Sequence, residues 1–135
     1  MRYSVEDIAL MHEKFGVHEW IAENPDKLNE LLRLRMRMLG EETMETIDAV
    51  QNNDPEEIVD GLIDVMVIAL GTLDIVGVNA KDAWDEVISA NLTKKVGVKP
   101  ERPNPLGLPD LVKPRNWKAP NHGGNHGKLE DFLNG

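Results

Sequence analysis

Apolar residues recur at helical spacing along the first two thirds of the chain and predict a body built from α-helices. Proline, glycine and capping residues bound four such segments, which cover residues 4–16, 25–50, 55–75 and 80–95. Asp54 is a good N-cap residue directly before Pro55, so the start of the third segment is the best defined. No segment alternates in the manner of a strand. The predicted fold class is therefore all-α, with the shape of a four-helix bundle.

The third predicted helix, residues 55–75, is apolar almost all round. Such a helix must be central or covered by a second subunit, which predicts a homodimer or a dimer of dimers. Beyond it the composition changes, because six of the eight prolines lie between residues 100 and 120. The expected organisation is a helical catalytic domain at residues 1–95 and an extended basic tail at residues 96–135. That tail is expected to pack on the body or on a neighbouring subunit.

Composition and charge narrow the classes of function. The 135 residues suit a single core, and the absence of cysteine excludes disulfides, thiolate metal sites and cysteine nucleophiles. No signal peptide or membrane-spanning run is evident, so we expect a cytoplasmic protein without a membrane partner. Residues 1–90 hold 20 acidic and 7 basic side chains, whereas residues 91–135 hold 4 and 8. A chain this acidic is a poor ligand for nucleic acid, and an anionic substrate would need metal ions or the basic tail.

Carboxylates interrupt the apolar faces of two consecutive predicted helices. They are Glu41, Glu42 and Glu45 on the second helix and Glu57, Asp60 and Asp64 on the third. A short connection makes the two helices antiparallel, so the acidic sets should face each other near the connected end. Converging carboxylates do not all stay ionised without cations. Ligation by oxygen alone selects a hard cation, Mg²⁺ or Mn²⁺.

The acidic pattern, EExxE followed by ExxD, resembles that of the all-α nucleoside triphosphate pyrophosphohydrolases. Its residues here are Glu41-Glu42-Thr43-Met44-Glu45 and Glu57-Ile58-Val59-Asp60. Flanking segments, among them Arg37–Gly40, Ala69–Thr72, Ala90–Lys94 and the Lys113-Pro114 pair with Trp117, are similar to the MazG-like and phage-encoded branch. The resemblance implies hydrolysis between the α and β phosphates, giving a nucleoside monophosphate and diphosphate.

The same resemblance assigns roles to the carboxylates. It implies that Glu42, Glu45, Glu57 and Asp60 hold the principal Mg²⁺, for which Mn²⁺ can substitute. It further implies that Glu41 and Asp64 complete additional metal sites or orient the attacking water. Glu41, Glu42 and Glu45 are thus the expected catalytic residues, and Asp64 is a fifth expected metal ligand.

Five residues are candidates for binding the substrate: Arg37, Asn91, Lys94, Lys113 and Trp117. Arg37 lies nearest to the acids, and the family's Asn-x-x-Lys element, here Asn91 and Lys94, faces phosphates. Lys113 makes the tail locally basic. Trp117 stands in a polar segment with little reason to be core, and it could stack on a base.

Three functions fit these features. The first is a Mg²⁺-dependent (d)NTP pyrophosphohydrolase that removes noncanonical nucleotides or, as in some phage members, acts on dGTP and GTP in the host cytoplasm. The second is phosphoribosyl-ATP pyrophosphohydrolase, which performs the same chemistry on another substrate. The third is a non-catalytic helical oligomer.

Overall fold

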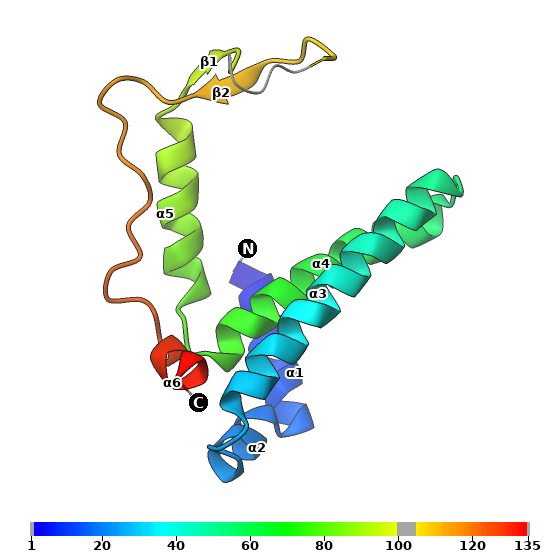
Figure 1. The fold of residues 1–135 in the computed structure, drawn as a ribbon, viewed down its shortest axis with the longest axis vertical. Helices are drawn as coiled ribbons and strands as arrows, with labels where there is room; N and C mark the ends of the chain where they lie inside the picture. Colours follow the sequence, from blue (N-terminus) through cyan, green and yellow to red (C-terminus); the bar gives the residue numbers. More distant parts are fainter. Residues whose placement is uncertain (1, 100–104, 135) are drawn as a thin grey trace. The chain divides into compact units, whose positions relative to one another are not determined.

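The computed structural model describes residues 2–99 and 105–134, and most of this chain is helical (Figure 1). Its six helices are α1 (Arg2–Phe15), α2 (Val17–Glu23), α3 (Leu28–Gln51), α4 (Pro55–Ile75), α5 (Ala80–Leu92) and α6 (Leu129–Leu133). The predicted all-α fold class is confirmed. The expectation that no strand forms is wrong at one place, where β1 (Lys95–Gly97) pairs antiparallel with β2 (Asp110–Val112).

The chain divides into two compact units. The first unit consists of residues 1–81 and 124–135 and contains α1 to α4 and α6. The second unit is residues 82–123 and holds most of α5 with the small sheet. No single helix in the described ranges is long and apolar enough to cross a membrane, and only the bent pair of α4 with α5 passes that test by length and composition.

An antiparallel hairpin of α3 and α4 is the central element of the first unit (Figure 1). As predicted, α4 begins at Asp54 and Pro55: the Asp54 carboxylate accepts a hydrogen bond of 3.2 Å from the backbone N–H of Glu57. The turn before it places Asn53 at a φ of 54°, a left-handed conformation that asparagine tolerates. Because the connection is so short, the second half of α3 lies beside the first half of α4.

The two helices approach most closely where Gly61 of α4 meets Thr46 of α3. A Cβ at Gly61 would collide with the Thr46 hydroxyl, which itself donates a hydrogen bond of 2.7 Å to the backbone oxygen of Glu42. Both Gly61 and Thr46 are buried. The missing side chain thus sets the spacing of the two helices next to the predicted catalytic acids.

The start of α3 differs from the prediction. Pro25 does not open a helix, because Asn24 instead ends α2: its backbone N–H donates to the Ile21 oxygen and its side chain to the Trp20 oxygen. Sequence analysis missed α2 altogether. Gly16, at a φ of 69°, ends α1 as expected, and its left-handed conformation turns the chain directly into α2.

The most buried side chain of the described chain is Phe132, in the segment predicted to be an extended tail. Phe132 packs with Ile75 and Val76, and partly buried residues of α2, α3 and α6 surround them. The backbone N–H of Lys128 donates to the Val76 oxygen at 2.6 Å, and Gly127 lies too close to Val76 for any side chain. The packing of Phe132 therefore anchors the C-terminal helix α6 in the core of the first unit.

In the second unit, the chain after β2 runs back along α5 (Figure 1). The indole N–H of Trp117 donates a hydrogen bond of 2.8 Å to the backbone oxygen of Ala90. The hairpin register pairs Lys95 with Val112 and Gly97 with Asp110. Trp117 thereby fixes the basic segment against the end of α5.

Gly61→Ala should destabilise the protein by about 1–3 kcal/mol, because the added methyl group overpacks the contact with Thr46. Gly40→Ala is the matched control on the neighbouring helix, since no other group lies within 4 Å of a Cβ there. A glycine-to-alanine change inside a helix and without a clash should stabilise by about 0.5–1 kcal/mol. Urea unfolding of both variants measures this. A Gly61→Ala variant as stable as Gly40→Ala would contradict the close approach.

Candidate active site

Four of the six predicted carboxylates interact across the α3–α4 hairpin. Glu42 and Glu45 come from α3, and Asp60 and Asp64 come from α4. We call these four the carboxylate cluster. The pKa of Glu42 is raised by its partial burial, by the negative charges of the other three, and by a hydrogen bond to Glu45. Acids from the two helices therefore share one electrostatic environment, as the sequence predicted.

The remaining two acids lie at the margin of the cluster. Glu41 and Glu57 do not contribute to the shifted pKa of Glu42. Both are exposed, as Glu45 and Asp60 also are, so only Glu42 and Asp64 of the six acids are half-buried. Glu57 precedes Asp60 by three residues, so it lies one turn away on the same face of α4. Glu41 is adjacent to Glu42 on α3. Both are within a helical turn of the cluster, which is where additional ligands or a water-orienting group would stand.

The donor set fits a hard divalent cation. Carboxylate oxygens are the ligands that Mg²⁺ and Mn²⁺ prefer. Ion pairs in residues 4–99 and 105–134 include those of His12 and His18 with Asp74 and of Lys99 with Asp110. In these ranges no ion pair is found for the carboxylate cluster. The cluster thus holds like charges that this part of the chain does not neutralise, and a divalent cation would supply the missing charge.

A pocket of about 540 Å³ lies between α2 and the first half of α3, and none of its lining residues belongs to the carboxylate cluster. Phe15, Trp20, Leu34 and Met38 give it apolar and aromatic walls. Its charged lining residues are Lys27, Glu30, Arg35 and Arg37. We call it the Trp20 pocket. Residues 34, 38, 41 and 45 follow one another at spacings of four, three and four, so the pocket and the acids lie along one stripe of α3. Arg37, predicted to bind substrate, lines this pocket.

The other predicted substrate-binding residues gather in the second unit. The ammonium groups of Lys94 and Lys113 lie 5.1 and 5.0 Å from the centroid of the Trp117 ring. Asn91 is three residues before Lys94, whose backbone N–H donates a hydrogen bond to the backbone oxygen of Asn91. A second pocket of about 720 Å³ lies against Trp117 and is lined by Lys95, Arg115 and Lys118. Lys94, Lys113 and Trp117 therefore form a basic group of their own, and Asn91 precedes Lys94 by about one helical turn.

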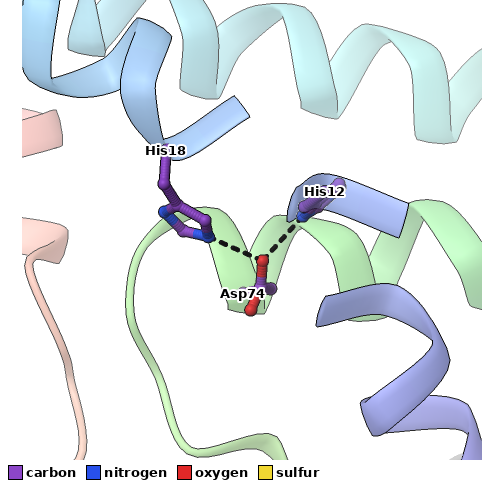
Figure 2. Close-up of side chains that lie close together, drawn as sticks. All are labelled: His12, His18 and Asp74. Atoms are coloured by element: carbon purple, nitrogen blue, oxygen red, sulfur yellow. Dashed lines mark hydrogen bonds and ion pairs between the residues drawn. The ribbon is translucent and has the colours of Figure 1, made fainter. Parts of the chain in front are cut away.

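A polar network that sequence analysis did not assemble links α1, α2 and α4. Asp74 of α4 accepts hydrogen bonds from His12 Nδ1 at 2.6 Å and from His18 Nε2 at 2.8 Å (Figure 2). Burial disfavours the charged form of Asp74, but the two histidines outweigh it and lower its pKa. The signal was available in the sequence, because Asp74 is an acid in an apolar run, as Asp60 and Asp64 are.

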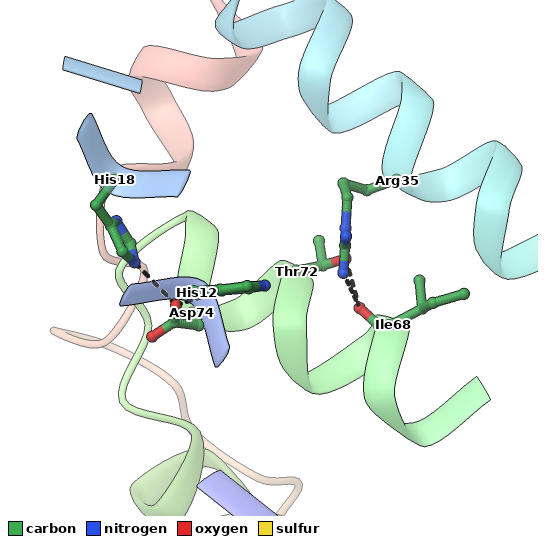
Figure 3. A network of polar contacts seen from close by, with 6 residues as sticks. All are labelled: His12, His18, Arg35, Ile68, Thr72 and Asp74. Atoms are coloured by element: carbon green, nitrogen blue, oxygen red, sulfur yellow. Dashed lines mark hydrogen bonds and ion pairs between the residues drawn. The ribbon is translucent and has the colours of Figure 1, made fainter. Parts of the chain in front are cut away.

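Arg35 extends the network along α4 (Figure 3). Its guanidinium donates to the Thr72 hydroxyl at 3.2 Å and to the Ile68 oxygen at 3.0 Å, and burial lowers its pKa. A Cβ at Gly71 would lie 2.5 Å from Arg35 Nη2 and 3.3 Å from His12 Cε1. Gly71 therefore makes room for both side chains against α4.

Comparison with known families decides the class of this site. The sequence model of the phosphoribosyl-ATP pyrophosphohydrolase family (PRA-PH) matches residues 13–91, which include α2, α3 and α4 and most of α5. The chain belongs to this family. The match confirms the predicted superfamily of all-α, MazG-like pyrophosphohydrolases. No curated protein and no solved structure matches the chain.

Membership of the PRA-PH family makes this protein a nucleotide pyrophosphohydrolase, a hydrolase acting on a phosphoanhydride bond. The matched residues contain the carboxylate cluster, all lining residues of the Trp20 pocket, and Asn91. Lys94, Lys113 and Trp117 lie beyond the match.

Without metal, neutralising one member of the cluster should stabilise the protein at neutral pH. Because the pKa of Glu42 is raised in the folded state, its contribution to stability is present below its ordinary pKa and lost as the pH rises through the raised value. Glu42→Gln should therefore raise the Tm at pH 7 in EDTA and change it less at pH 4. Asp48→Asn, an exposed acid on the same helix, is the control. Equal effects of the two substitutions at pH 7 would contradict the repulsion.

Proposed function

We propose that the protein is a Mg²⁺-dependent nucleoside triphosphate pyrophosphohydrolase. The reaction converts a (d)NTP and water to a (d)NMP and diphosphate: the water oxygen bonds to phosphorus, and the α–β phosphoanhydride bond breaks. The observation that carries the proposal is the convergence of Glu42, Glu45, Asp60 and Asp64, which raises the pKa of Glu42. A cluster of like charges between two helices destabilises the fold unless a cation binds there.

The residues of the cluster have distinct tasks in this proposal. Glu42, Glu45, Glu57, Asp60 and Asp64 hold Mg²⁺, with Mn²⁺ as a substitute. A bound divalent cation would neutralise phosphate charge, and it would lower the pKa of the water that it coordinates to near neutral. Glu41, exposed beside Glu42, orients the attacking water. No covalent bond between enzyme and substrate is required.

The nucleoside half of the substrate is proposed to enter the Trp20 pocket. The pocket shares a stripe of α3 with Glu41 and Glu45, and Met38 is only about 4.5 Å along the helix axis from Glu41. Trp20 is 42% exposed, so its ring is accessible for stacking on a base. Arg37 lines this pocket and precedes Glu41 by four residues, about one helical turn, and it is proposed to bind a phosphate.

The basic group of the second unit is proposed to bind the leaving phosphates. Lys94 and Lys113 lie near the Trp117 ring at cation–π distances, which restrains both ammonium groups. Asn91 is proposed to bind with them, as the family resemblance implies. Trp117 is also proposed to stack on a base. A stacked base would have to displace the ammonium group of Lys94 or Lys113 from the ring. Closure of this segment over a site in its own or a neighbouring subunit is part of the same proposal.

Two classes of substrate are proposed, and their rates of hydrolysis should be compared directly. The resemblance to phage members favours dGTP and GTP, and the family match favours phosphoribosyl-ATP. Both have a phosphoanhydride bond between α and β phosphates, so the carboxylate cluster serves either. A cytoplasmic location, where nucleoside triphosphates occur, belongs to the same proposal.

A homodimer is proposed because the α3–α4 hairpin leaves large apolar side chains uncovered. Val59, Leu62 and Ile63 of α4 are 64, 55 and 52% exposed, and Met44 and Val50 of α3 are similarly exposed. Two copies of the hairpin packed together would cover these residues as a four-helix bundle. Light scattering at micromolar concentration should give at least twice the mass of the chain. A monomer would contradict this assembly.

Glu45→Ala and Asp60→Ala should each lower kcat/KM by at least about 100-fold, because metal ions supply several kcal/mol to the transition state and 1.36 kcal/mol is a factor of ten. The assay is diphosphate release from the common NTPs, dNTPs and phosphoribosyl-ATP, with and without Mg²⁺. Glu56→Ala, an exposed acid in the first turn of α4, is the matched control and should stay active. Normal hydrolysis by both variants would refute the metal assignment.

Trp20→Ala should raise KM with little change in kcat, because stacking on the base binds substrate and transition state alike. Stacking contributes about 1–3 kcal/mol per base, so KM should rise roughly 5- to 150-fold. Trp84→Ala is the control, because Trp84 has nearly the same exposure, 45% against 42%, on α5. Steady-state kinetics on the best substrate distinguish the two. An unchanged KM for Trp20→Ala would exclude the pocket as the base site.

A further inference from the structure

Three side chains from three helices converge at one point of the first unit (Figure 2). His12 lies in the last turn of α1, His18 in α2, and Asp74 in the last turn of α4. One ligand atom of each residue, a ring nitrogen or a carboxylate oxygen, lies within 4.8 Å of those of the other two. Both histidines point at the same oxygen, Oδ2 of Asp74.

Packing explains the position of only one of the two histidines. His12 is 3% exposed, and its ring lies against the backbone of α4 at Gly71, next to Arg35. His18 is different, because 52% of its side chain is exposed. Val17 and Ile21 already pack α2 on the core, so the inward orientation of His18 is not needed to hold this helix. The orientation of His18 is instead set by its contacts with Asp74 and His12.

The chemistry of the three donors is that of a transition-metal site. Two imidazole nitrogens and one carboxylate oxygen form a set that binds Zn²⁺ and other first-row divalent ions, whereas Mg²⁺ prefers oxygen alone. Burial fixes His12, and the exposed side of His18 leaves a path by which an ion can enter.

We propose that His12, His18 and Asp74 bind a divalent transition-metal ion, Zn²⁺ by their donor chemistry, at a site separate from the carboxylate cluster. Asp74 is ten residues beyond Asp64 on α4, which corresponds to about 15 Å along the helix axis. The ion joins α1 and α2 to the end of α4. Phe15, Gly16 and Val17 lie between the two histidines in the sequence and line the Trp20 pocket. The bound ion therefore holds one wall of that pocket in place.

Co²⁺ is the spectroscopic probe for this site, used on the full chain in excess Mg²⁺ so that the carboxylate cluster is saturated. The wild type should bind one equivalent of Co²⁺ with visible d–d absorption, and Zn²⁺ should displace it. His18→Ala and Asp74→Asn should each weaken binding by at least about 10-fold. His126→Ala, an exposed histidine outside the three, should leave binding unchanged.

Thermal unfolding of the same proteins gives a second measurement that does not depend on hydrolysis. Zn²⁺ should raise the Tm of the wild type and of Glu45→Gln, but not that of His18→Ala, whose helicity should be intact because His18 is exposed. If Co²⁺ does not bind, or binding survives His18→Ala and Asp74→Asn but fails in Glu45→Gln, the site is overturned. The three residues would then be only a hydrogen-bonded anchor. Because no arm measures catalysis, this failure is distinguishable from failure of the proposed function.

Discussion

The contact between Gly61 and Thr46 is the constraint on which the site depends. It brings the backbones of α3 and α4 close together at the point where each helix carries its acids. The apolar stripes that drive the two helices together therefore also force four carboxylates into one environment. Like charges held in this way oppose folding, and a bound cation removes that opposition. This arrangement is the reason for proposing that the protein binds a metal ion between α3 and α4.

Local signals were enough to predict the central hairpin and the convergence of its acids. The Asp54-Pro55 start of α4 and the spacing of Glu42, Glu45, Asp60 and Asp64 are decided within one or two helical turns. Helical geometry and a short connection then place the acids face to face. The prediction of this hairpin succeeded because its structure does not depend on contacts with distant segments of the chain.

Features that depend on distant segments were missed or misplaced. Phe132 is one ring on a five-residue helix, too short for periodicity to detect, yet it is the centre of the core. The convergence of His12 and His18 on Asp74 joins residues more than 50 positions apart. α2 follows α1 after a single glycine, so its seven residues looked like part of a loop. In each case tertiary contacts, which a pattern along the chain does not contain, decide the structure.

Helix α4 carries two donor sets of different chemistry. Oxygen donors near its start suit a hard cation and a triphosphate, while His12 and His18 add nitrogen donors at its end. The Trp20 pocket lies between α2 and α3 and includes Ile75, the residue after Asp74. The nucleoside and phosphate portions of a substrate would thus be recognised on neighbouring parts of one hairpin, with the α1–α2 junction as the outer wall.

Anomalous diffraction from crystals grown with Mn²⁺ and an NTP analogue that resists cleavage between the α and β phosphates tests this account most directly. The account predicts an anomalous peak between α3 and α4, at bonding distance from carboxylate oxygens of Glu42 or Glu45 and of Asp60 or Asp64. Fully occupied Mn²⁺ bound only elsewhere, with those oxygens turned towards solvent, would contradict it.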